Sequence, residues 1–321
     1  MQHQQHMLDT KVAEVAKEVD AVSLVLQEER QAMWTVLRSS ISQKLDYWLT
    51  LVYPSQVRKA AEDMDKLEMQ VMDKLIGVHV PLHEEGLGWD CPLRLPIMGL
   101  NGKSFQHWVL RQPIKMGGFG LRSKVETSPA AFIGGLEQAL PHFTGEGGIC
   151  PALRQVLGDW SGQEDKRWQQ LLQSGCRTGL EFSRCWDILQ GEARECSAYL
   201  GQELDGHLAV PIEGVGEGSV DGSTRRSVVQ QREELRGAVM KEALSRLDST
   251  QRPVRAWLNR DKLSSSWLQC LPGPNGLSSQ AFSEAMALIL CMPSPACKDR
   301  IGDWGSCWQK NCGLVWRQYH V

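Results

Sequence analysis

Apolar residues recur every three or four positions from the start of the sequence. This spacing places them along one side of an α-helix, whereas a half-buried strand would alternate apolar and polar residues. No alternating segment of useful length occurs in the 321 residues. The sequence therefore predicts a mainly α fold, a helical bundle with irregular Gly- and Pro-rich connections. The first apolar stripe consists of Leu8, Val12, Val15, Val19, Val22 and Leu26.

The amino-terminal stripe predicts a long helical hairpin. The 3–4 spacing continues to Val52, and Pro54 ends it because proline lacks a backbone amide hydrogen. Ser55 is a suitable cap for a second helix, whose stripe runs from Val57 to Leu75. We therefore expect two long helices, one on each side of Pro54, paired within a first region over residues 1–80.

Prolines and glycines divide the rest of the chain. We expect a basic, glycine-containing segment and a helical domain over 81–204, a flexible linker over 205–223, a helical linker domain over 224–300 and a divergent tail over 301–321. One helix is expected to start at Ser128 and Pro129 and to close at Pro141, with small residues that allow close helix contact. The small residues of this helix are Ala130, Ala131, Gly134, Gly135 and Ala139. Further helices are expected from Ser104 to Pro113, within 151–204 (two or three), over 224–247 and over 279–290.

Charge is distributed unevenly along the chain. The net charge is −3, from 35 Lys and Arg against 38 Asp and Glu, which by itself indicates no polyanionic partner. However, no Asp or Glu occurs from Cys91 to Val125, so this stretch is basic within an otherwise acidic protein. We call it the basic segment. Its six cations are Arg94, Lys103, Arg111, Lys115, Arg122 and Lys124.

Three glycines, Gly117, Gly118 and Gly120, lie within the basic segment. They lack the spacing and the terminal Lys-Ser/Thr of a phosphate-binding loop, and no predicted strand precedes them, which argues against nucleotide binding. One interpretation is a turn that positions its two flanks, because glycine most often serves backbone geometry. The other is contact with nucleic acid, in which the cations neutralise phosphates while Trp108 and Phe119 stack on bases. Both aromatic residues are equally compatible with core positions.

Neither a catalytic nor a metal-binding constellation is evident. No serine or cysteine nucleophile has supporting context, and paired carboxylates such as Glu84 and Glu85 are sequence neighbours, which on a helix would point to different faces. The C-x5-C and C-x4-C spacings near the carboxyl terminus are looser than those of zinc knuckles, so we expect no cofactor and ordinary reduced thiols. Cys176, Cys185 and Cys196 are spaced like buried helix positions. The zinc candidates are Cys291, Cys297, Cys307 and Cys312, with His320.

The amino terminus, MQHQQHMLDTKV, lacks the apolar core of a signal peptide. The ten cysteines do not form the spacing of a small disulfide framework, and the apolar runs are too short to span a bilayer. We therefore expect a soluble, intracellular protein that has no membrane partner.

Three segments resemble one family. The stretch LRQPIKMGGFGLRSKVETSPAAFIGGLEQALPHF resembles the region just downstream of the polymerase core in non-LTR (LINE-type) retrotransposon reverse transcriptases, where a glycine turn precedes a small-residue helix. The earlier SSISQKLDYWLTLVYPSQVRKAAEDMD is similar to their helical thumb. The later SSSWLQCLPGPNGLSSQAFSEAMALILCMPSPAC is similar to their post-thumb linker. The resemblance extends from about Met33 to Lys298, and the tail after Ile301 departs from it.

The resemblance implies a non-catalytic part of a longer polyprotein. The adjacent Asp-Asp pair that holds polymerase magnesium in that family is absent from the sequence, as is the Pro-Asp element of its endonuclease, so we expect no enzyme activity. The implied partner is RNA or an RNA–DNA hybrid, and the implied location is nuclear. The expected nucleic-acid contacts are Lys103, Arg111, Lys115, Arg122, Lys124 and Trp108, with Gly117, Gly118 and Gly120 forming a structural turn.

A second hypothesis stays open beside the nucleic-acid-binding module. The stripe that begins at Leu8 also has the spacing of a helix that pairs with a second protein. In this case the chain is a helical scaffold for protein–protein interaction, or a non-functional remnant of a retroelement.

Overall fold

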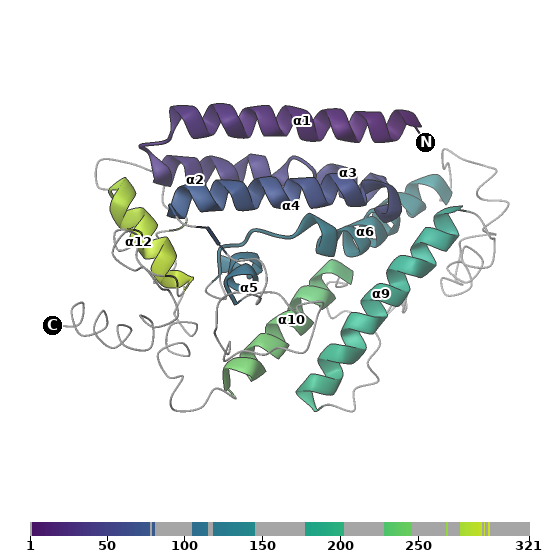
Figure 1. The fold of residues 1–321 in the computed structure, drawn as a ribbon. Helices are drawn as coiled ribbons and strands as arrows, with labels where there is room; N and C mark the ends of the chain where they lie inside the picture. Colours follow the sequence, from purple (N-terminus) through teal and green to yellow (C-terminus); the bar gives the residue numbers. More distant parts are fainter. Residues whose placement is uncertain are drawn as a thin grey trace. The chain divides into compact units, whose positions relative to one another are not determined.

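A computed structural model describes residues 2–77, 79–80, 105–114, 118–144, 177–201, 228–245 and 277–290, together with positions 268, 292 and 295. Within these residues the regular structure is helical and contains no strand, which confirms the mainly α prediction (Figure 1). The elements are α1 (Gln2–Val25), α2 (Arg30–Ser39), the 3-10 helix η1 (Ile41–Gln43), α3 (Asp46–Leu51), α4 (Pro54–Ile76), α5 (Phe105–Arg111), α6 (Lys124–Thr144), α9 (Arg177–Leu200), α10 (Val228–Ser245) and α12 (Ser279–Ile289).

The described residues belong to two compact units. Unit 1 takes them from 1–10, 45–64 and 123–242, and unit 2 takes them from 11–44, 65–122 and 243–321. The linker predicted over 205–223 and the tail predicted over 301–321 lie outside the described residues.

The amino-terminal region differs from the predicted hairpin. The prediction of one helix from Leu8 to Val52 is wrong, because α1 ends at Val25 and Leu26–Glu29 form a turn. Glu29 leaves the helical conformation, with φ −118° and ψ 63°, and its carbonyl then accepts the first hydrogen bond of α2. The second predicted helix is confirmed, but α4 starts at Pro54, so Ser55 lies inside the helix and is not its N-cap. Gly77, at φ +84°, follows the end of α4.

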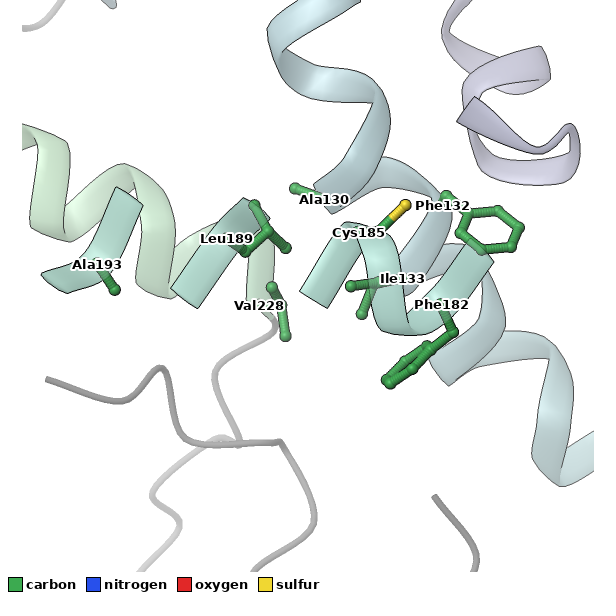
Figure 2. Close-up of a cluster of buried hydrophobic side chains, with 8 residues drawn as sticks. All are labelled: Ala130, Phe132, Ile133, Phe182, Cys185, Leu189, Ala193 and Val228. Carbon is green, nitrogen blue, oxygen red and sulfur yellow. The ribbon is translucent and has the colours of Figure 1, made fainter. Parts of the chain in front are cut away.

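Small residues on α6 allow close helix packing in unit 1. A Cβ atom added at Gly135 would lie 2.4 Å from the carbonyl oxygen of Thr50 on α3, so only glycine fits there. One added at Gly134 would lie 3.5 Å from Val229 on α10. The predicted role of these glycines in close helix contact is therefore confirmed at Gly135. Figure 2 shows the adjoining core, formed by Ala130, Phe132, Ile133, Phe182, Cys185, Leu189, Ala193 and Val228.

The start of α6 lies earlier than the predicted Ser128–Pro129. The Ser123 hydroxyl accepts a hydrogen bond from the Glu126 amide at 3.3 Å, which is the geometry of a serine N-cap. Pro129 then lies inside the helix, where it cannot donate to the carbonyl of Val125. The Ser128 hydroxyl donates to that carbonyl instead, at 3.0 Å, which explains how the helix tolerates the proline. The helix also runs beyond the predicted end at Pro141, to Thr144.

Two arginines of α10 form ion pairs with the other helices of unit 1. Arg232 donates to both carboxylate oxygens of Glu192 on α9, at 2.5 and 2.8 Å, and Arg236 donates to Glu126 on α6 at 3.0 Å. Burial lowers the pKa of Arg232, but its hydrogen bond to Glu192 and the surrounding carboxylates raise the pKa overall. The guanidinium therefore stays charged in the interior of unit 1.

The core of unit 2 is organised around Trp34 on α2. The indole is fully buried, and its Nε1–H donates to the carbonyl oxygen of Leu268 at 2.8 Å. Its ring packs edge-on against Phe119, with the centroids 5.6 Å apart. A second tie involves α12, where the Ser283 hydroxyl donates at 2.6 Å to the Leu75 carbonyl near the end of α4. Residues far apart in sequence therefore meet in this unit.

Candidate functional site

The candidate site is the part of the basic segment that follows α5 in unit 2. We call residues 112–121 the glycine turn; its positions 115–117, which include Lys115 and Gly117, lie outside the described residues. The last residues of the turn lie against the end of α5. The Phe119 amide donates to the Val109 carbonyl at 3.2 Å, and the Leu121 amide donates to the Leu110 carbonyl at 3.0 Å.

Glycine is required for backbone reasons at two positions of the turn. A Cβ atom at Gly118 would lie 2.3 Å from the carbonyl oxygen of Gln112 and 2.6 Å from that of Val109, so no side chain fits. Gly120 has φ +76°, in the left-handed region that disfavours other residues. Its amide donates to the Gln112 carbonyl at 2.7 Å, which closes the turn. Both glycines therefore serve the path of the backbone.

Phe119 is a core residue. Its side chain is fully buried against Trp34, and a nucleic-acid base cannot stack on a ring in this position. Of the two interpretations open for this aromatic residue, the structure supports the core position.

Arg111 is buried and paired, which corrects its sequence-based assignment to an exposed contact surface. Its side chain is only 5% exposed, and Nη1 lies 2.8 Å from Oε2 of Glu68 on α4. Nη2 lies 3.6 Å from Oδ1 of Asp65, and Nη1 also donates to the carbonyl of Leu121 at 3.3 Å. The guanidinium thus joins α5, α4 and the end of the glycine turn, and it does not face solvent.

Lys124 is likewise an internal residue, in unit 1. Its side chain is 3% exposed, and Nζ lies 2.7 Å from Oδ1 of Asp46 at the start of α3. This ion pair ties the first residue of α6 to α3. The position therefore differs from the predicted exposed contact in the same way as that of Arg111.

Among the described residues of the basic segment, Arg122 is the cation that is exposed to solvent. Its two neighbours, Leu121 and Ser123, are both buried, so only the Arg122 side chain points outward at this place. Of the other predicted contact residues, Trp108 belongs to α5 but its side chain is outside the described part, and Lys103 and Lys115 lie outside it altogether.

Sequence reasoning missed the acidic partner of Arg111. Glu68 is fully buried and occupies the helix face that also carries Met64 and Met72, four residues before and after it. A carboxylate on an apolar stripe requires a buried cation or several donors. This signal was present in the sequence, since Glu68 interrupts a stripe of apolar residues on α4.

The described residues contain neither a cluster of possible metal ligands nor a reactive thiol. No group of three or more possible metal ligands occurs among them, and the four zinc-candidate cysteines lie outside them. Cys185 and Cys196 on α9 are buried as predicted, and Cys176 is outside the described part. Burial, more than the nearby carboxylates, raises the pKa of each of these two thiols to about 12, so both are protonated and unreactive at neutral pH.

None of the described helices is long and apolar enough to cross a membrane. No family model, curated protein or solved structure matches the chain. The resemblance to retrotransposon reverse transcriptases therefore stays a prediction from the sequence.

Proposed function

We propose that the chain is a non-catalytic nucleic-acid-binding module that grips RNA or an RNA–DNA hybrid, within a reverse transcriptase polyprotein of the non-LTR type. The observation that supports it is the position of Arg122. This exposed cation follows directly after a hydrogen-bonded glycine turn, in a stretch without acidic residues. A cation held on a fixed backbone loses less conformational entropy when it binds a phosphate.

The contact set of this proposal is smaller than the sequence suggested. Arg111 and Lys124 are already paired with carboxylates, so the cation contacts reduce to Arg122 with Lys103 and Lys115. Phe119 lies in the core, so Trp108 is the aromatic residue that stays in the proposed contact set. The cation contacts bind the phosphate backbone and carry no base information, so this part of the binding is expected to be independent of sequence.

The test is fluorescence anisotropy with a labelled RNA and a labelled RNA–DNA hybrid over a range of salt. Each phosphate contact lowers the logarithm of affinity by about 0.7 to 0.9 per decade of salt, so three contacts give a slope of about 2.1 to 2.7. The double variant K115E/R122E should weaken binding to every sequence and flatten the slope. Unchanged affinity in this variant, with its helicity retained, would refute the proposal.

The matched control is K59E/K66E. Both lysines are exposed on α4, where acidic residues surround them, so this double variant makes the same charge change away from the basic segment. It should leave the affinity within experimental error of wild type. An equal loss in both double variants would mean that net charge, and not the glycine turn, governs binding.

The scaffold hypothesis needs an apolar surface other than the predicted one. The stripe residues Leu8, Val15 and Val19 are buried within the chain and are not available to a second protein. On α3, however, Tyr47 is 68% exposed and Leu51 is 57% exposed, and residues four apart lie side by side on a helix. If this pair joins two copies of the chain, Y47S/L51S should convert a dimer into a monomer in sedimentation analysis.

A further inference from the structure

We infer that Arg111 is a positioning residue for Arg122: by holding the carbonyl of Leu121 against α5 and α4, it fixes the place at which the exposed cation leaves the turn. The inference rests on the proposed function, because it assigns to Arg111 an effect on nucleic-acid binding without contact. It concerns unit 2 alone, where all the residues involved lie.

The guanidinium of Arg111 makes bonds in two directions. On one side it meets the carboxylate of Glu68 at 2.8 Å, and on the other it donates to the Leu121 carbonyl at 3.3 Å. A guanidinium presents five donors in a rigid planar fork, so it suits this double role better than a lysine ammonium does. The side chain therefore works as a bracket between a regular helix and the end of an irregular turn.

Leu121 is held through both of its backbone polar groups. Its amide donates to the carbonyl of Leu110 at 3.0 Å, and its carbonyl accepts from Arg111. Its side chain is buried as well. Since Arg122 is the next residue, these contacts hold the peptide group that joins the two residues and so fix the place of the Arg122 Cα atom.

Burying an ion pair is a costly way to fill space. Apolar side chains of the same volume often stabilise a fold as well or better, because both ions must leave water. They could not, however, donate to the Leu121 carbonyl, which would then be buried without that donor. Because Glu68 and Asp65 neutralise Arg111 locally, its contribution to binding comes from position and not from added positive field.

Amide hydrogen exchange tests the bracket without any nucleic acid. In E68Q/R111Q the charges of the two most deeply buried groups disappear together, while Asp65, whose side chain is 15% exposed, keeps its charge. The Leu121 amide should then exchange roughly tenfold faster, the scale of losing one hydrogen bond to a charged group. The amide of Met33, bonded to the Glu29 carbonyl in α2 of the same unit, serves as the control and should be unchanged. Unchanged exchange at Leu121 overturns the inference, as does equal acceleration at both amides.

A double-mutant cycle tests the link to binding. R122Q and E68Q/R111Q should each weaken RNA affinity, by up to roughly tenfold, and the triple variant E68Q/R111Q/R122Q should be no weaker than R122Q. R111K, which keeps the charge, should recover part of the loss. Additive losses, with a further drop in salt slope, would make Arg111 a direct contact and overturn the inference. If wild type binds neither RNA nor hybrid, the proposed function fails, while hydrogen exchange still decides whether the bracket exists.

Discussion

Two regions of this protein depend on glycine for different physical reasons. In the glycine turn, Gly118 and Gly120 let one chain segment fold back on itself, through the lack of a side chain in one case and a positive φ in the other. On α6, Gly135 keeps ordinary helical geometry and instead lets a second helix approach. The comparison shows that a glycine pair in a sequence does not reveal whether it bends a backbone or joins two helices.

The largest loss of stability is expected on substitution of Gly118. In Gly118→Ala the new methyl group would lie 2.3 Å from the carbonyl oxygen of Gln112, which also accepts the hydrogen bond from the Gly120 amide. Overpacking of this severity costs about 3 kcal/mol. Urea unfolding followed by circular dichroism measures the loss. Gly191→Ala on α9 is the control, since no atom lies within 4 Å of its added Cβ, and it should stabilise the protein slightly.

A smaller loss is expected where α6 meets α3. Gly135→Ala places a methyl group 2.4 Å from the Thr50 carbonyl oxygen, but alanine also favours the helical conformation over glycine, which offsets part of the loss. We expect a net loss of about 2 kcal/mol. Gly134→Ala, with its nearest contact at 3.5 Å, should be neutral or stabilising in the same urea experiment. Equal effects at the two positions would contradict the proposed close contact.

Gly120 tests the cost of a positive φ without a close steric contact. The residue has φ +76°, and the nearest atom to a Cβ there is a side-chain carbon of Ile114 at 3.4 Å, an ordinary contact distance. Gly120→Ala should therefore cost about 1 kcal/mol, the strain of a left-handed alanine. Gly120→Asn should cost less, because asparagine tolerates this region better. If asparagine is as harmful as alanine, space and not φ limits the position.

A further loss of stability is expected at alkaline pH, from two thiols of unit 1. The folded-state pKa of Cys185 and Cys196 is about 12, above the unfolded value, so the folded state keeps protons that the unfolded state loses. Stability from this source is complete below about pH 9 and declines as pH rises toward 12. Both thiols belong to unit 1. Urea midpoints at pH 8 and pH 10 should differ less in C185V/C196V than in wild type.

Much of the helical fold was predictable because local patterns encode it. The stripe from Val57 to Leu75 predicted α4, and the segment 279–290 agrees with α12 to within one residue. The turn at Leu26–Glu29 was not predictable in this way, since neither proline nor glycine marks it. The start of α6 was encoded in the sequence, as a serine three positions before a glutamate, but Ser128 and Pro129 offered a competing start signal.

The candidate site was less predictable, because its electrostatics depend on residues distant in sequence. Arg111 pairs with a glutamate 43 residues earlier, and Lys124 pairs with an aspartate 78 residues earlier. A stretch without acidic residues therefore looked uniformly exposed and basic, although its counter-charges are supplied by α4 and α3. Burial of a charge is a property of tertiary packing, and the sequence window around a cation does not contain its partner.

The hydrogen bond of Trp34 has a consequence for synthesis on the ribosome. Its acceptor, the carbonyl of Leu268, lies 234 residues later in the chain. A nascent chain that has not yet passed Leu268 leaves the indole N–H without this acceptor, and a buried tryptophan normally needs one. The centre of unit 2 is therefore among the last parts to become complete, and an early stop of translation removes it while sparing most of unit 1.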